Sequence, residues 1–264
     1  MKIGIIKTAL SFWFASGFLL SSLFPFPFMK LKTLWRLPLD LPECFTVTAH
    51  AGAMGLPDNS AVAINAAVQA GFDIVEIDLS FWPDGTPVVI HDSEPKQNKG
   101  LPLEEALAII ANSEKTKINI DCKSSANMAE VYRLILAYGL EERSFFTGVL
   151  EQTKEEIIRD CPLPYYLNYT TDPQRRNDTD YARDLAQLVK DGGYLGINCD
   201  YRQVTPEIIE AMHAQGLLVS LWTVNKSSDM IRTLSLGPDN ITTKHPHRLL
   251  WLIEKWGEDK AIFK

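Results

Sequence analysis

Two carboxylates stand two residues apart in an apolar stretch of the sequence. Glu76 and Asp78 alternate with Val75 and Ile77, and residues two apart on a strand point to the same side. Two carboxylates on one side repel each other unless a cation lies between them, and hard divalent cations take oxygen ligands of this kind. Surface charges at a strand edge are the alternative, which the apolar neighbours disfavour. Asp121, at the end of another apolar run, is a candidate third ligand.

Two histidines close apolar runs in the same part of the chain. His50 follows Val47-Thr48-Ala49, and His91 follows Val88-Val89-Ile90. A single histidine at such a place is usually a hydrogen-bonded structural residue. Two of them beside a metal site suit an acid–base pair, because imidazole titrates near neutral pH.

These residues need a scaffold that brings strand ends together, and the rest of the chain supplies one. From Phe45 onward, short β-rich runs alternate with helical stretches, a pattern that predicts a parallel sheet covered by helices. The strand candidates are 46–49, 74–78, 87–90, 117–121, 143–147, 165–168, 195–199, 218–222 and 240–243. The helix candidates are 59–70, 103–111, 128–138, 152–159, 178–190, 205–215, 227–236 and 246–255.

We therefore predict an α/β fold, a (β/α)8 TIM-type barrel, for which the roughly 220 residues after position 44 suffice. The barrel is expected to be irregular between its second and third strands, where Asp84-Gly85 joins two strand candidates without a helix. Since there are nine strand candidates, one is expected to lie outside the barrel.

Polar residues follow almost every strand candidate at its carboxyl end. Caps and turns alone would scatter polar residues over both ends. In a (β/α)8 barrel the active site lies at the carboxyl ends of the strands, so this bias predicts one mouth that carries the chemistry. The residues are His50, Glu76, Asp78, His91, Asp92, Asp121, Lys123, Asn168, Asn198 and Asn225.

The net charge of the protein limits the kinds of molecule that it can bind. The net charge is -7, and the first 44 residues carry five Lys/Arg against two Asp/Glu, so the remainder is at -10. An acidic body argues against nucleic-acid binding, which needs a basic surface. A phosphate substrate remains compatible, because a bound divalent cation reverses the local field. The four cysteines are widely and irregularly spaced, and we predict no disulfide framework.

The N-terminus forms a separate segment. Residues 9–28 contain no charge, and 20 residues are long enough to span a bilayer core of roughly 30 Å. A cleaved signal peptide and an uncleaved membrane anchor both remain open. We expect residues 1–28 to be one of these, 29–44 to be a linker and 45–264 to be the barrel domain. The protein is then membrane-anchored or secreted, and the flanking lysines leave its orientation open.

The ordered set of motifs resembles the glycerophosphodiester phosphodiesterases over roughly residues 45–250. The similar segments are Thr48-Ala49-His50-Ala51-Gly52, Pro57-Asp58-Asn59-Ser60, Val75-Glu76-Ile77-Asp78, residues 84–92 (DGTPVVIHD), Ile120-Asp121-Cys122-Lys123, Leu221-Trp222-Thr223-Val224-Asn225 and residues 237–243 (GPDNITT).

The resemblance implies a barrel that hydrolyses glycerophosphodiesters to an alcohol and glycerol 3-phosphate. In that family the glycerol hydroxyl attacks phosphorus and water opens the resulting cyclic phosphate. By this resemblance His50 and His91 are the acid–base pair, and Glu76, Asp78 and Asp121 are the ligands of Mg²⁺ or Ca²⁺. Lys123 contacts the phosphate, and Trp222 and Asn225 make further substrate contacts.

The chain also departs from the family pattern. Ala51 stands where the family has an arginine, Asp58 and Asp121 replace glutamates, and only Ser93–Leu101 stands where the family often inserts a small helical subdomain. Another cation is therefore expected at the phosphate. Arg202 and Lys244 both follow strand candidates, and we expect Arg202, because its planar fork can bind phosphate at two points.

Two alternatives remain open at this point. Sphingomyelinase D-type enzymes, which act on choline phospholipids, are similar in lacking that arginine and in having an aspartate as third ligand, and a membrane anchor would suit a lipid substrate. A barrel that binds ligands without turnover is the other alternative. Release of glycerol 3-phosphate from glycerophosphocholine in a metal-dependent reaction would distinguish them. The sequence does not indicate an oligomeric state.

Overall fold

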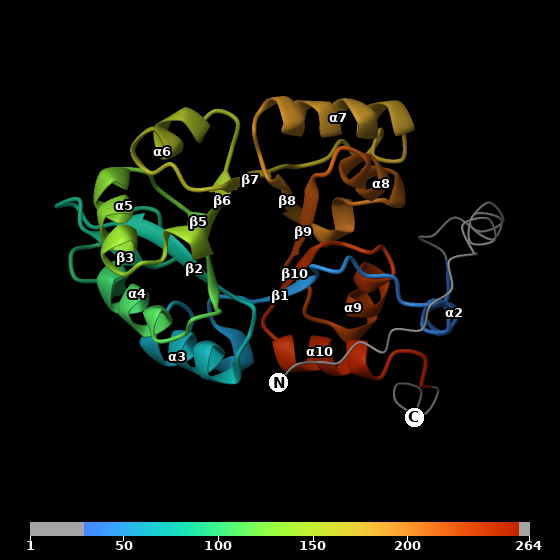
Figure 1. Cartoon of the computed structure of the whole chain (residues 1–264), viewed down its shortest axis with the longest axis horizontal. Helices are drawn as coiled ribbons and strands as arrows, with labels where there is room; N and C mark the ends of the chain where they lie inside the picture. Colours follow the sequence, from blue (N-terminus) through green and yellow to red (C-terminus); the bar gives the residue numbers. More distant parts are fainter. Residues whose placement is uncertain (1–28, 259–264) are drawn as a thin grey trace.

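A computed structural model describes residues 29–258, in which eight parallel strands close into a barrel (Figure 1). Beginning at β1, the barrel order is β1-β10-β9-β8-β7-β6-β5-β2, and β1 pairs with β2 to close the ring. The strands are β1 (Thr46–Ala49), β2 (Ile74–Phe81), β5 (Lys117–Cys122), β6 (Ser144–Val149), β7 (Tyr165–Asn168), β8 (Gly196–Asp200), β9 (Leu218–Trp222) and β10 (Asn240–Thr243). The predicted TIM-type barrel is confirmed.

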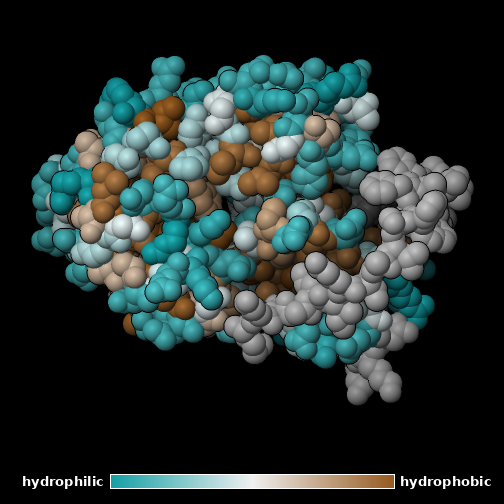
Figure 2. Space-filling view, in the orientation of Figure 1, coloured by the Kyte–Doolittle hydropathy of each residue, from teal (hydrophilic) through white to brown (hydrophobic). Residues whose placement is uncertain are grey.

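Helices surround the barrel and bury their apolar sides against it. On α7 the buried residues include Leu185 and Val189, and Figure 2 shows hydrophilic residues along its outer side at the top of the view. Proline opens α8 and α10, where its fixed φ suits the first turn. The helices are α3 (Ala61–Ala70), α4 (Leu103–Ala111), α5 (Met128–Ala137), α6 (Lys154–Asp160), α7 (Thr179–Asp191), α8 (Pro206–Ala214), α9 (Ser227–Leu234) and α10 (Pro246–Glu254).

The predicted irregularity lies between β2 and β5. Here β3 (Pro87–Val89) runs antiparallel to the last residues of β2, and the two-residue strand β4 (Leu101–Pro102) pairs with β3. Gly85 has a φ of +83° in the turn between β2 and β3, a conformation that glycine adopts at little cost. The ninth strand candidate thus lies outside the barrel. Its pairing also extends β2 three residues beyond the predicted end at Asp78.

The barrel interior is polar, whereas the layer between strands and helices is apolar. Inside, the Asn240 amide donates to Thr48 Oγ1 at 2.8 Å, and the Asn198 amide donates to Asn168 Oδ1 at 2.9 Å. Ser220 Oγ donates to Asn198 Oδ1 at 2.9 Å. These bonds satisfy polar groups that are buried from water. The inward positions of the barrel are therefore available to polar side chains, including those at the mouth.

The segment expected to be a linker contains a short helix, α2 (Leu31–Leu34), that lies beside α9 (Figure 1). Leu34 and Trp35 are completely buried, and the Trp35 ring lies 4.9 Å from the ring of Trp256. Residues 29–44 are therefore packed on the outer helices of the barrel.

The hydrophobic segment expected to be a signal peptide or a membrane anchor, residues 1–28, lies outside the described residues, as do residues 259–264. Among the helices of residues 29–258, none is both long and apolar enough to cross a bilayer.

Candidate active site

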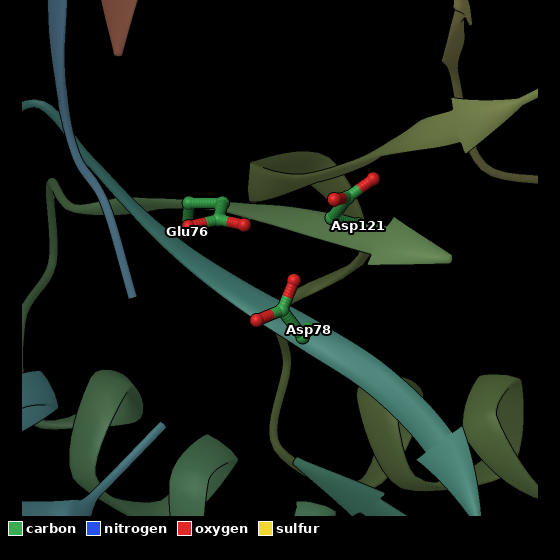
Figure 3. Close-up of side chains that lie close together, drawn as sticks. All are labelled: Glu76, Asp78 and Asp121. Atoms are coloured by element: carbon green, nitrogen blue, oxygen red, sulfur yellow. The ribbon is translucent and has the colours of Figure 1, made fainter. Parts of the chain in front are cut away.

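Glu76, Asp78 and Asp121 lie together inside the barrel mouth, with their carboxylates turned toward one another (Figure 3). Parallel pairing of β2 with β5 puts Asp78 directly opposite Asp121. Each of the three contributes an oxygen, and these oxygens all lie within 4.8 Å of one another. The three predicted metal ligands are thus brought into one cluster.

The charge of this cluster is only partly balanced. Lys123 Nζ lies 3.1 Å from Asp78 Oδ1 and 2.5 Å from Asp121 Oδ2. Burial lowers the pKa of Lys123, but the charges and hydrogen bonds of Asp121 and Asp78 outweigh it, so the pKa is raised overall. The pKa of Glu76 is also raised, by burial and by the charges of Asp78 and Asp121. One ammonium facing three carboxylates leaves negative charge in a buried place, and a divalent cation with oxygen ligands fits this donor set.

Asn59 orients one of the carboxylates. Its amide nitrogen donates to Asp78 Oδ2 at 2.6 Å, and its Oδ1 accepts the backbone N–H of Asp78 at 3.1 Å. We predicted no role for Asn59, although it lies in one of the motifs. Asn59 lies in the loop between β1 and α3, so its two hydrogen bonds connect this loop to the carboxylate cluster.

Gly148 makes room for Asp121. It lies in β6 with a φ of +74°, where the pairing of β6 with β7 shifts register. A Cβ at this position would lie 2.5 Å from Asp121 Oδ1. The N–H of Gly148 donates to Asn168 Oδ1 at 2.9 Å, which fixes the bulge. Sequence reasoning missed this residue, because a single glycine in a strand candidate carries no sign of what approaches it.

His50 stands at the edge of the cluster. Its backbone N–H donates to Thr243 O at 3.0 Å, and its Nδ1 lies 3.9 Å from Glu76 Oε2. Nδ1 is buried and has no hydrogen-bond partner among residues 29–258. Burial lowers the pKa of His50, and the charge of Asp78 opposes that shift. The ring is therefore neutral near pH 7 and can accept a proton.

His91 is exposed and follows β3 by two residues. The N–H of Ile90 donates to Asp78 O at 2.9 Å, so the backbone at His91 lies beside the part of β2 that carries the carboxylates. Within the described residues, no hydrogen bond or ion pair joins the His91 ring to the cluster. The structure thus brings His91 to the mouth with its side chain open to solvent.

The other residues predicted to contact substrate are Arg202, Trp222 and Asn225, and they differ in their hydrogen bonding. The guanidinium of Arg202 pairs with Asp200 and its side chain is 72% exposed. Trp222 is half-buried, and its Nε1 finds no hydrogen-bond partner in the described part of the chain. Asn225 Oδ1 accepts the backbone N–H of Lys244 at 2.9 Å, so Asn225 connects the loops that follow β9 and β10.

The chain is similar in sequence to known phosphodiesterases along almost the whole barrel. The model of the glycerophosphoryl diester phosphodiesterase family matches residues 50–98 and 97–248. A curated glycerophosphodiester phosphodiesterase of Caldanaerobacter subterraneus subsp. tengcongensis is 24% identical over 248 residues, which cover 80% of this chain and 98% of the relative.

Solved structures share the fold. A crystal structure of a protein from Silicibacter pomeroyi, described as a putative glycerophosphoryl diester phosphodiesterase, is 21% identical with a TM-score of 0.69, covering 85% of this chain and 97% of that one. A phosphodiesterase of Oleispira antarctica, solved in complex with the product sn-glycerol-3-phosphate, is 19% identical with a TM-score of 0.64 and covers 81% of this chain and 97% of that one.

Proposed function

Because this chain belongs to the glycerophosphoryl diester phosphodiesterase family, we propose that it hydrolyses glycerophosphodiesters to an alcohol and glycerol 3-phosphate. The observation that carries the proposal is the buried cluster of Glu76, Asp78 and Asp121 with His50 at its edge. These residues match the positions that the family motifs assign to metal ligands and to an acid–base histidine. The product named for the Oleispira antarctica phosphodiesterase agrees with this substrate class.

The environments of the two histidines suggest how they share the proton transfers. His50 is mostly buried with a lowered pKa, so its neutral ring accepts the proton of the attacking glycerol hydroxyl. His91 is exposed at the mouth and donates a proton to the leaving alkoxide, which departs toward solvent. Water then opens the cyclic phosphate with the two roles exchanged.

The carboxylates and Lys123 handle charge. Glu76, Asp78 and Asp121 would hold Mg²⁺ or Ca²⁺, which stabilises negative charge on the phosphate oxygens when bound. Lys123 is held by two of these carboxylates and contacts the phosphate from the same side. Asn59 keeps the Asp78 carboxylate in its orientation throughout.

The location of the protein is a further part of the proposal. The uncharged run of residues 9–28 supports a membrane-anchored or secreted protein, and the acidic body does not support nucleic acid as a partner. An enzyme at or near a membrane would act on substrates made from membrane lipids.

The test is an assay of glycerol 3-phosphate release from glycerophosphocholine by the full chain, with Mg²⁺, with Ca²⁺ and with EDTA. We expect activity that EDTA abolishes reversibly and that Asp78→Asn abolishes in a folded protein. Asp200→Asn is the matched control, since that carboxylate also ends a strand but pairs with Arg202 outside the cluster. Full activity in EDTA would contradict the metal role. Turnover of sphingomyelin or lysophosphatidylcholine in place of glycerophosphocholine would favour the sphingomyelinase D-like alternative.

A further inference from the structure

A further ion pair joins the loop after β1 to the end of the neighbouring strand β10, beside His50. Lys244 Nζ lies 2.9 Å from both carboxylate oxygens of Asp58. Lys244 is the first residue after β10, and Asp58 lies in the loop between β1 and α3. The pair is half-exposed, with 35% of the lysine side chain and 56% of the aspartate side chain accessible.

The backbone on both sides of this pair is tied to the active site. Lys244 donates its N–H to Asn225 Oδ1 and accepts the N–H of Met54, each at 2.9 Å. Its neighbour Thr243 accepts the N–H of His50. The neighbour of Asp58 is Asn59, which binds the Asp78 carboxylate. Each member of the pair therefore stands one residue away from a group that positions a residue of the active site.

Gly52 allows the aspartate to approach. A Cβ at position 52 would lie 1.7 Å from Asp58 Oδ1, so the Asp58 carboxylate occupies space that only a glycine leaves open. The side chain at position 51 is a buried methyl group and brings no charge to this place. The cation on this side of His50 comes from β10 instead.

The backbone places Lys244 next to His50, because the preceding residue, Thr243, accepts the His50 N–H at 3.0 Å. A negatively charged group bound at His50 would therefore lie beside the end of β10, which carries this cation. Lys123 lies between Asp78 and Asp121 within the carboxylate cluster, and Arg202 pairs with Asp200. Lys244 is also paired, with Asp58, but it stands beside His50, where the side chain at position 51 brings no charge.

A half-exposed ion pair of this kind contributes little to stability, so Lys244 can exchange the Asp58 carboxylate for another anion. We propose that Lys244 is a phosphate-binding residue of this active site, held ready by Asp58 and transferred to a phosphate oxygen when substrate binds. The inference rests on the proposed function, since it concerns the phosphate of the same substrate. It assigns to Lys244 the contact that we expected from Arg202.

The experiment compares Lys244→Met with Lys244→Arg and with Lys226→Met. Lys226 is an exposed lysine in the loop after the neighbouring strand β9 and is the matched control for a general loss of positive charge. In the presence of Mg²⁺, two quantities are measured. They are kcat/KM for glycerophosphocholine and the dissociation constant of glycerol 3-phosphate by calorimetry. We expect Lys244→Met to weaken both by about 10-fold or more, Lys244→Arg to recover most of the loss, and Lys226→Met to stay within about twofold of the parent.

A double variant separates phosphate binding from a purely structural ion pair. If Lys244 only neutralises Asp58, then Asp58→Asn restores Lys244→Met to the parent level. If Lys244 binds phosphate, a loss of about 10-fold remains in the double variant. Thermal melting of each variant shows whether it is folded.

Two results would overturn the proposal. One is parent-like binding of glycerol 3-phosphate by folded Lys244→Met, and the other is full rescue by Asp58→Asn. Arg202→Met is measured in parallel, and a loss in that variant with none in Lys244→Met would return the contact to Arg202. Failure of the proposed function looks different. The parent would then not hydrolyse glycerophosphocholine at all, whereas glycerol 3-phosphate binding would still report on Lys244.

Discussion

Asp78 and Asp121 are register partners on the adjacent parallel strands β2 and β5, and the ammonium of Lys123 lies between their carboxylates. Lys123 stands two residues beyond Asp121, so β5 and the residue that follows it supply both a carboxylate and the ammonium that pairs with it. The third carboxylate, Glu76, receives the N–H of Ala51 at 2.7 Å. The cluster therefore holds its shape through bonds from three separate segments.

Replacing Lys123 should destabilise the metal-free protein, because the three carboxylates would then lose the ammonium that balances part of their charge. We expect Lys123→Met to lower the stability of metal-free protein by about 3 kcal/mol, the low end for removing one partner of a buried pair, because the lysine is partly exposed. Added Mg²⁺ should recover much of that loss. Thermal melting in EDTA and in Mg²⁺ measures both effects. Equal melting temperatures of parent and variant in EDTA would show that the lysine does not stabilise the cluster.

The two histidine variants should show kinetic defects of similar size. We expect His50→Ala and His91→Ala each to lower kcat by at least about 10²-fold. The double variant should be about as slow as either single one, because both residues serve one step. Steady-state kinetics with glycerophosphocholine measures this. Near-normal kcat in one single variant would make that histidine structural.

The acidic limb of the pH profile should lie below the ordinary imidazole value. The pKa of His50 is lowered from 6.5 by burial, so its neutral form persists to lower pH. We expect kcat/KM to fall only as the pH drops below about 6.5. Between the lowered pKa and 6.5 the unfolded chain binds the proton more readily, so the His50 contribution to stability is lost as the pH falls through this window. An acidic limb of kcat/KM with its midpoint above pH 7 would contradict the assignment of His50 as base.

Two glycines with similar φ test the close approach of β6 to the end of β5. At Gly148 (φ +74°) a Cβ would lie 2.5 Å from both Asp121 Oδ1 and the backbone oxygen of Cys122, whereas Gly139 (φ +63°) has nothing within 4 Å. Both alanine variants carry the strain of a positive φ, roughly 1–2 kcal/mol. We expect only Gly148→Ala to weaken Mg²⁺ binding, by about 10-fold. Metal titration by calorimetry measures this, and equal metal affinity in both variants would refute the contact.

The alternation of short β-rich runs with helical stretches was sufficient to predict most of the barrel. The strands at 46–49, 165–168, 218–222 and 240–243 have the predicted bounds, because turn residues border each of them. The strand at 101–102 was missed. Two residues ending in proline give no strand pattern, and only the partner β3 makes them one.

The candidate site was predictable where residue type and strand position decide the chemistry. Glu76 and Asp78 face one side because they are two apart, and that needs no tertiary knowledge. The expected role of Arg202 depended on the direction of a long side chain, which Asp200 fixes. The pairing of Lys244 with Asp58 joins residues 186 positions apart, and no local pattern contains it.

The closing seam of the barrel has a consequence for how the chain folds. Thr46–Ala49 pairs with Asn240–Thr243, and the side chain of Asn240 donates to Thr48 across that seam. During synthesis the free edge of the first strand must wait until almost the whole chain has left the ribosome. Contacts between residues so far apart slow folding, because the loop must close before any pairing rewards it. An unpaired edge kept open for that time favours association with other chains, so the order of the strands itself exposes the nascent chain to aggregation.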